Sequence, residues 1–134
     1  MTPTENFSLE DGFACFRPVG EFTLEAVTRS IDEAIACCVE SGIRNLLVDL
    51  RDVTGFPPPG LVERFYFISQ WAATSGGRLR LAIVAKSELI AEDMFDIVVA
   101  ANRGMTSNAF TDRDEAVAWL KKNSYSSPPP STGT

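Results

Sequence analysis

Histidine is absent from all 134 residues of the chain, and this absence limits its chemistry. Histidine is the commonest general base in enzymes and a frequent zinc ligand, so Ser-His and Cys-His nucleophile pairs and most zinc sites are excluded. The few cysteines are Cys15, Cys37 and Cys38, and their spacing matches neither a zinc knuckle nor a redox C-x-x-C motif. We therefore expect a protein that is not an enzyme and has no metal or cofactor, with its cysteines as buried thiols in a reducing cytoplasm.

Long apolar runs and an excess of positive charge are also missing. No stretch reaches ~18 consecutive apolar residues, so we expect no transmembrane segment. Residues 1–6 are polar and lack the basic and apolar regions of a signal peptide. The net charge is −6, which argues against nucleic acid or an anionic membrane as a partner, because both require a basic face. The expected localisation is therefore the cytoplasm.

What is present fits one globular domain. The hydrophobic content is 45% and the charged content 22%, values that are ordinary for a folded domain. We expect residues 1–123 to fold as a single domain. Residues 124–134 are rich in serine and proline and cannot bury enough apolar surface to order themselves, so they are predicted to be a flexible tail.

The pattern of apolar residues predicts alternating strands and helices. Two short apolar runs flank Asp11-Gly12, a pair that is typical of a tight β-hairpin turn. Apolar residues at helical spacing between Leu24 and Ser41 predict an amphipathic helix that Thr23 caps. Further strands are predicted at 45–50, 79–85 and 108–110, and further helices at 59–74, 88–103 and after residue 112.

This order, ββαβαβαβα, predicts an α/β fold. Helices between successive strands imply parallel crossovers after the initial antiparallel hairpin. We expect a mixed sheet of about four to five strands with about four helices, mainly on one face of the sheet.

The stretch at residues 49–61 is the most informative motif. It reads Asp-Leu-Arg-Asp-Val-Thr-Gly-Phe-Pro-Pro-Pro-Gly-Leu and joins a buried strand to the start of a helix. This frame resembles the signature loop of STAS domains, the family of anti-sigma-factor antagonists and sulfate-transporter tails. Residues 109–120 are similar to the closing strand and helix of a divergent bacterial antagonist-like branch, so the resemblance covers about residues 7–122. It implies the same order of elements and a regulatory protein that binds other proteins.

The loop departs from the family at the positions that carry its switch. In STAS antagonists the three residues before Gly-Leu are typically Asp, Ser and Ser or Thr, and the middle serine is phosphorylated. Here they are Pro57, Pro58 and Pro59, which have no hydroxyl and no backbone N–H. We therefore predict that phosphorylation at this position does not switch the protein. The prolines form either a rigid start of the helix or a rigid recognition surface of polyproline type.

The helix predicted at 59–74 carries more large apolar side chains than one buried stripe needs. One stripe is predicted to face the sheet, and a set of aromatic residues to lie beside or opposite it. The inner stripe is Leu61, Phe65, Ile68 and Ala72, and the surplus rings are Tyr66, Phe67 and Trp71. Exposed rings of this kind mark a protein partner, a dimer contact or a ligand groove, unless the next helix or the tail covers them.

Asp49 and Asp52 follow the central strand, at the edge of the sheet where α/β folds bind ligands. Two carboxylates there either bind a cation or make only local contacts. In the second case Asp52 closes an Asx turn, and Asp49 is solvated or caps backbone N–H groups. No third ligand is evident nearby, so no metal site is predicted.

The leading interpretation is a non-catalytic interaction module that binds a protein partner or a second copy of itself as a homodimer. The alternative is a small-molecule binding protein that holds an apolar or lipid-like ligand between the second and third helices; an enzyme is less favoured. The candidate binding residues are Phe56, Pro57, Pro58, Pro59, Gly60, Glu63, Tyr66, Phe67 and Trp71.

Overall fold

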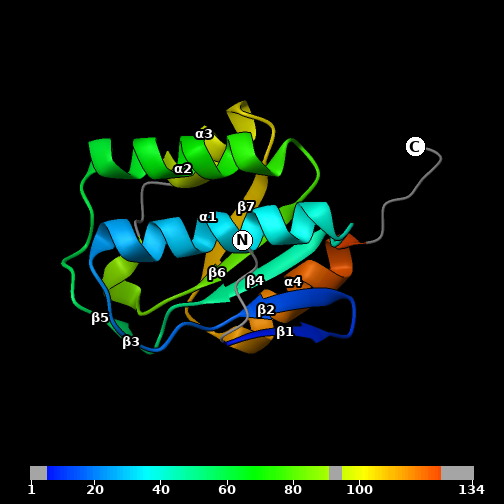
Figure 1. Cartoon of the computed structure of the whole chain (residues 1–134), viewed down its shortest axis with the longest axis horizontal. Coiled ribbons are helices and arrows are strands. Elements are labelled where there is room, and N and C mark those ends of the chain that lie inside the picture. The colour runs from blue at the N-terminus through cyan, green and yellow to red at the C-terminus, as the bar shows by residue number, and fades with distance from the viewer. Residues whose placement is uncertain (1–5, 91–94, 125–134) are drawn as a thin grey trace.

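The computed structural model describes residues 6–90 and 95–124, and five strands within these ranges form one central sheet (Figure 1). They are β1 (Phe7–Glu10), β2 (Phe13–Phe16), β4 (Asn45–Asp49), β6 (Arg80–Val84) and β7 (Thr106–Phe110). The order across the sheet is β1-β2-β4-β6-β7. β1 and β2 pair antiparallel, whereas the pairs from β2 to β7 are all parallel, which confirms the predicted mixed sheet.

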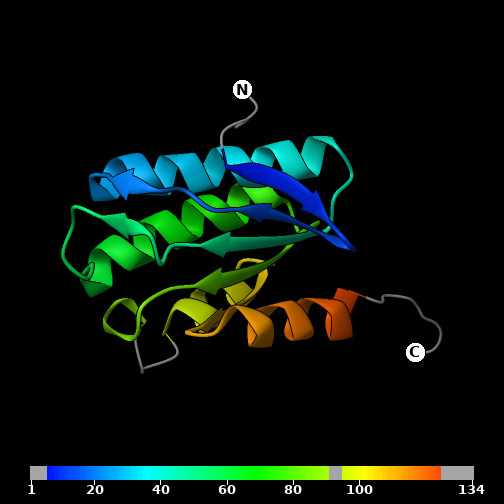
Figure 2. The same cartoon turned by 90° about the horizontal axis from the view of Figure 1, so that it is seen from below.

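Helices cover both faces of this sheet, and most of them lie on one face, as predicted. The helices are α1 (Leu24–Glu40), α2 (Leu61–Ser75), α3 (Phe95–Asn102) and α4 (Arg113–Ser124). α1, α2 and α3 contribute to the hydrophobic core on one side of the sheet, and α4 packs on the other side. Figure 2 shows α1, in blue to cyan, and α4, in orange, on either side of the strands.

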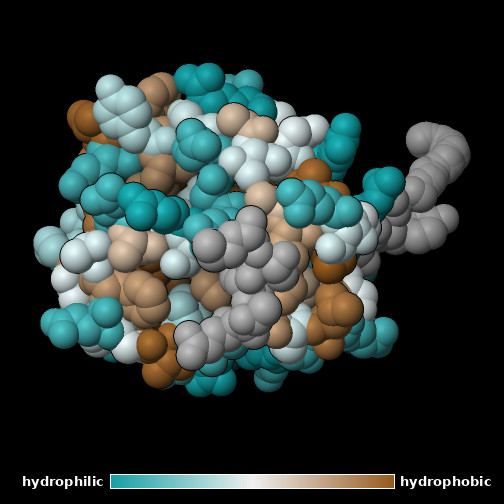
Figure 3. Space-filling view, viewed as in Figure 1, coloured by the Kyte–Doolittle hydropathy of each residue, from teal (hydrophilic) through white to brown (hydrophobic). Residues whose placement is uncertain are grey.

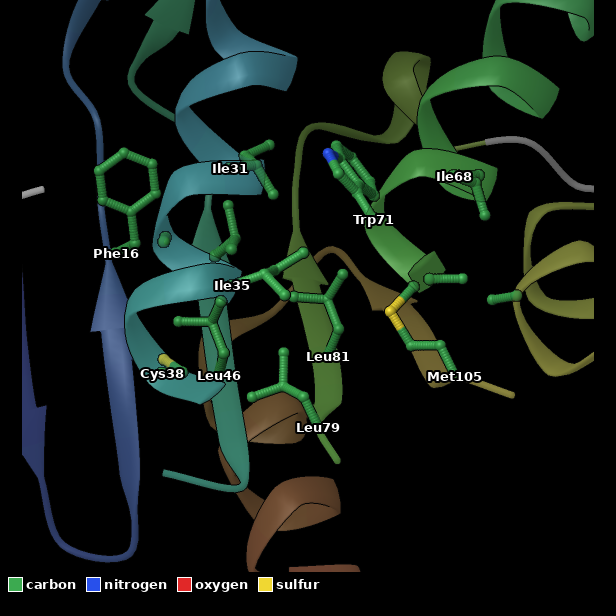
Figure 4. Packing of buried hydrophobic residues seen from close by; sticks show 14 of the residues in the cluster. Phe16, Ile31, Ile35, Cys38, Leu46, Ile68, Trp71, Leu79, Leu81 and Met105 are labelled. Carbon is green, nitrogen blue, oxygen red and sulfur yellow. The ribbon is translucent and has the colours of Figure 1, made fainter. Parts of the chain in front are cut away.

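The central strand β4 is buried on both sides. Leu46 and Val48 enter the core under α1 and α2, whereas Leu47 between them enters the core under α4. Figure 4 shows Ile35 of α1 meeting Leu46 of β4 and Leu81 of β6 in the first of these cores. A strand covered on both faces needs apolar side chains at successive positions, which explains the continuous apolar run in the sequence.

Local signals in the first forty residues are confirmed. Asp11-Gly12 forms the hairpin turn, and Gly12 has a φ of +88°. The Thr23 hydroxyl oxygen accepts a hydrogen bond of 3.0 Å from the backbone N–H of Ala26 and caps α1. The buried stripe of α1 is Val27, Ile31, Ala34, Ile35, Cys37 and Cys38. All three cysteines are buried free thiols.

The predicted third helix is wrong at its start. Residues Ser87–Leu89 form only a short 3₁₀ turn, η1, and Ile90 is extended with φ −99° and ψ 118°. Within the described residues, α3 covers Phe95–Asn102. Leu89 and Ile90 pack against the core under α1 and α2, so the chain leaves helical geometry there and directs both side chains inward. Residues 91–94, which the prediction also covers, lie outside the described residues.

The predicted tail, residues 124–134, also lies outside the described residues, except for Ser124, which ends α4. Within the described part of the chain, no helix is long and apolar enough to cross a membrane.

Candidate functional site

The loop between β4 and α2 is fixed by a second, small sheet. β3 (Gly20–Glu21) pairs in parallel with β5 (Val53–Thr54). The backbone N–H of Phe22 donates a 2.7 Å hydrogen bond to the carbonyl of Thr54 at the end of this pair. Gly55 follows with a φ of +113°, and a Cβ there would collide with the backbone of Phe22. Only glycine fits this position, so the loop leaves the sheet along one defined path.

The two aspartates of the loop each have an arginine partner. Asp49 is fully buried and accepts hydrogen bonds of 3.0 and 2.8 Å from the Arg51 guanidinium, and one of 3.1 Å from the Arg51 backbone N–H. Burial raises the pKa of Asp49, but the hydrogen bonds and charge of Arg51 outweigh it, so the pKa lies below its ordinary value. Asp52 accepts hydrogen bonds of 2.9 and 2.6 Å from Arg17.

These pairs correct the expectation for the aspartates. Asp49 makes the local turn contact and is buried, whereas Asp52 joins the loop to the segment after β2 through Arg17. Neither carboxylate is arranged to share a cation with the other, because each is engaged by its own guanidinium. The described residues contain no group of three or more His, Cys, Asp or Glu side chains that could hold a metal ion.

The prolines precede α2 and do not form its first turn. Gly60 is the N-cap and Leu61 the first helical residue, so the prediction of a helix that starts at Pro59 is wrong by two positions. The Glu63 carboxylate accepts a 2.8 Å hydrogen bond from the backbone N–H of Gly60. Gly60 and Glu63 thus form the start of the helix, and Pro57 and Pro58 are left exposed in an irregular segment before it.

The buried face of α2 differs from the predicted one. Ile68 and Ala72 are buried as expected, but Trp71 is also buried, with 6% of its surface exposed. Its indole N–H donates a 3.0 Å hydrogen bond to the carbonyl of Thr28 in α1. Phe67 is half-buried against the same core, and its ring centroid lies 4.7 Å from that of Trp71.

The N-terminal half of α2 carries exposed apolar side chains, which we call the α2 patch. It consists of Leu61, Val62, Phe65 and Tyr66, with exposed fractions of 52, 67, 37 and 70%. Of the predicted surplus rings only Tyr66 is exposed. The prediction that Leu61 and Phe65 face the core is wrong, because both lie at the surface. The Phe65 ring has Tyr66 at 6.0 Å and the Arg103 guanidinium at 5.1 Å from its centroid. In Figure 3 hydrophobic residues appear at the upper left, over the start of α2.

A cavity of about 120 Å³ lies between α1, α2 and the sheet. Phe56 and Pro59 from the loop and Phe67 and Trp71 from α2 contribute to its lining. The structure therefore divides the predicted site residues into two groups. These four surround the cavity, whereas Pro57, Pro58, Gly60, Glu63 and Tyr66 are exposed.

Residues 13–121 match the family model described as SpoIIAA-like. The chain belongs to the SpoIIAA-like family. This membership covers most of the chain and agrees with the STAS resemblance of its loop and closing helix. No curated protein sequence matches the SpoIIAA-like chain significantly.

Solved structures share the fold of this SpoIIAA-like chain at low sequence identity. One is an anti-sigma factor antagonist from Mycobacterium paratuberculosis, 14% identical, with a TM-score of 0.57 over 90% of this chain and 99% of that chain. Another is an uncharacterized protein of the DUF3478 family with a SpoIIAA-like fold from Shewanella loihica PV-4. It is 21% identical, with a TM-score of 0.50 over 85% of this chain and 89% of that chain.

Proposed function

We propose that this SpoIIAA-like domain is a non-catalytic regulatory module that binds a protein partner through Pro57, Pro58 and the α2 patch. The observation that carries the proposal is the α2 patch itself, large apolar side chains exposed side by side on the first turns of one helix. Exposed apolar clusters of this kind are typical of interaction sites, and aromatic residues are frequent anchors of interfaces. The likeness in fold to an anti-sigma factor antagonist supports a regulatory role.

The rigidity of the loop supports binding as well. Two contacts fix the loop before the prolines begin. β5 of the loop pairs with β3, and Asp52 of the loop forms an ion pair with Arg17. Proline fixes its own φ, so Pro57 and Pro58 add little conformational freedom. A surface that is already ordered loses less entropy when a partner binds, and more of the contact energy then appears as affinity.

The proposed module works without phosphorylation at the loop position of the STAS family. Pro57, Pro58 and Pro59 carry no hydroxyl, and the nearest loop hydroxyl is that of the exposed Thr54. The Glu63 carboxylate is already hydrogen-bonded to the Gly60 N–H at the start of α2, where an anion would otherwise find donors.

Features of the thiols favour a non-catalytic, cytoplasmic protein. Burial, with a smaller effect of the neighbouring Cys37, raises the pKa of Cys38 to about 12. Burial also raises the pKa of Cys15. Thiols held in the protonated form are poor nucleophiles, and free buried cysteines are typical of proteins in a reducing compartment.

Site-specific photo-crosslinking in cells tests the proposal. A photoreactive phenylalanine analogue at Tyr66 is expected to give a covalent product with a protein partner or with a second copy of the chain. The same analogue at Leu9, an equally exposed apolar position on β1, is the matched control and is expected to give little product. A second experiment places the photoreactive group at Pro58. The double variant Val62→Asp/Tyr66→Asp is expected to prevent crosslinking of the partner to this group, whereas the control Leu9→Asp/Val19→Asp is expected to leave the crosslinking unchanged. Equal capture at Tyr66 and Leu9 would contradict the proposal.

A further inference from the structure

The cavity behind the loop has the properties of a binding site in its own right. Its walls come from α1, α2, β6, β7 and Met105, the residue before β7. Figure 4 shows Ile31, Trp71, Leu81 and Met105 converging on one another. We propose that it binds a small apolar molecule about the size of benzene. This site is separate from the α2 patch and needs no protein partner.

The lining is mainly apolar, and its polar members are Thr28, Arg64, Ser107 and Asn108. The Thr28 hydroxyl at the border donates a 2.9 Å hydrogen bond to the carbonyl of Leu24, and the indole N–H of Trp71 donates to the carbonyl of Thr28. The Asn108 side-chain oxygen accepts a 2.8 Å hydrogen bond from the backbone N–H of Ala109. The Thr28 hydroxyl, the Trp71 indole N–H and the Asn108 side-chain oxygen are thus already hydrogen-bonded within the protein. A buried water needs about 2–4 polar partners, so the interior of the cavity favours an apolar occupant over water.

The size of the cavity limits the ligand. Its volume of about 120 Å³ is close to the ~150 Å³ of an engineered apolar cavity that stays dry and binds benzene or xenon. A long acyl chain is several times larger than this space. The structure thus narrows the apolar or lipid-like ligand expected from the sequence to a compact molecule. The rings of Phe67 and Trp71, 4.7 Å apart between centroids, form an aromatic wall that favours a flat ring as the occupant.

The loop covers the cavity. Phe56 and Pro59 line it from the loop, and Leu89 and Ile90 line it from η1 and the residue after it. All four are only half-buried, so the cover is thin. Small movements of these side chains are enough to admit a ligand, because no strand or helix of the core has to separate.

Fluorescence quenching by bromobenzene tests the site, since bromine quenches an indole that it contacts. The chain has two tryptophans, so the Trp119→Phe variant keeps only Trp71. Trp119 lies in α4 on the other face of the sheet, away from the cavity. Saturable quenching of this variant is expected at millimolar bromobenzene. In the Trp71→Phe variant the remaining Trp119 is expected to show only a weak, linear response. Linear quenching of equal slope in both variants would overturn the proposal.

A cavity-filling variant provides the second measurement. Ala85→Leu adds three carbons to a residue that lines the cavity, and it is expected to weaken bromobenzene binding at least tenfold. Ala109→Leu, at another lining position, serves the same purpose if the first variant folds poorly. Benzene at ten times its half-saturating concentration is expected to raise the melting temperature of the unmodified protein by about 3–5 °C. The absence of any such rise, or an equal rise in both filled variants, would also overturn the proposal.

Discussion

Asp49 and Arg51 form a bidentate ion pair between residues only two positions apart, with the carboxylate fully buried and the guanidinium partly exposed. The pair sits where β4 ends and the loop begins, and it turns the chain toward the small β3–β5 sheet. The two partners do not contribute equally to stability. Arg51 can be solvated alone, whereas Asp49 cannot.

Arg51→Ala is therefore expected to destabilise the protein more than Asp49→Asn. Removing the arginine leaves a buried charge without compensation, which costs about 3 kcal/mol or more. Removing the charge of Asp49 while keeping its shape costs about 1–2 kcal/mol, because some hydrogen bonds survive. Urea denaturation at neutral pH measures both values. A milder effect of Arg51→Ala would mean that water reaches Asp49 in the native state.

The lowered pKa of Asp49 predicts a loss of stability in acid. The unfolded carboxylate titrates near its ordinary value of 3.8 and the folded one at lower pH, so the unfolded chain binds more protons in this range. The contribution of Asp49 is complete above the unfolded pKa and disappears as the pH falls through the folded pKa. The difference in unfolding free energy between the unmodified protein and Asp49→Asn is expected to be constant from pH 7 to 5 and to shrink below about pH 4. Urea titrations across this range measure it, and a difference that persists into strong acid would contradict the assignment.

The faces of α2 predict opposite results for two aromatic residues on the same helix. Trp71→Ala removes a buried ring and its hydrogen bond to Thr28, and is expected to cost about 3–5 kcal/mol. Tyr66→Ala removes an exposed ring and is expected to change stability by no more than about 0.5 kcal/mol. Chemical denaturation of both variants is the measurement. Similar costs for the two would mean that the helix is rotated about its axis relative to this structure.

Gly55→Ala is expected to be more damaging than the same change at another glycine with positive φ. Gly42 has a φ of +75° and open space where an alanine Cβ would lie, so Gly42→Ala tests the backbone strain alone. At Gly55 the methyl group would also collide with the Phe22 backbone. The cost at Gly55 is expected to exceed that at Gly42 by about 1 kcal/mol or more. Thermal denaturation compares the stabilities of the two variants. Equal losses of stability would show that the β3–β5 pair can shift to accommodate the added methyl group.

Much of the fold follows from strong local signals in the sequence. Asp11-Gly12 predicts its hairpin because few other residues take positive φ at the second turn position. The stripe through Ile31 and Ile35 predicts α1 because its opposite face is polar, so only one orientation buries the apolar residues. Leu47 is predicted to be buried because its neighbours are also apolar.

The orientation of α2 did not follow from the sequence, because both of its faces are apolar. Contacts with α1 determine which face of α2 is buried. The carbonyl of Thr28 accepts a hydrogen bond from the Trp71 indole N–H, and the Asp32 carboxylate accepts one of 2.6 Å from the Thr74 hydroxyl. These contacts join residues more than forty positions apart, and no local pattern indicates them. The excess of apolar residues on the helix was a correct signal of a surface patch, but it identified only Tyr66 among its members.

The position of Phe56 and Pro59 has a thermodynamic consequence. A molecule in the cavity touches the inner side of the loop, and a partner on Pro57 and Pro58 touches its outer side. With both proposed sites in use, the two binding equilibria share one short segment of backbone. Any factor by which the small molecule changes the affinity for the partner must then equal the factor by which the partner changes the affinity for the small molecule. Such reciprocal coupling would let the loop respond to a small molecule at the positions where the STAS resemblance implies a phosphorylated serine.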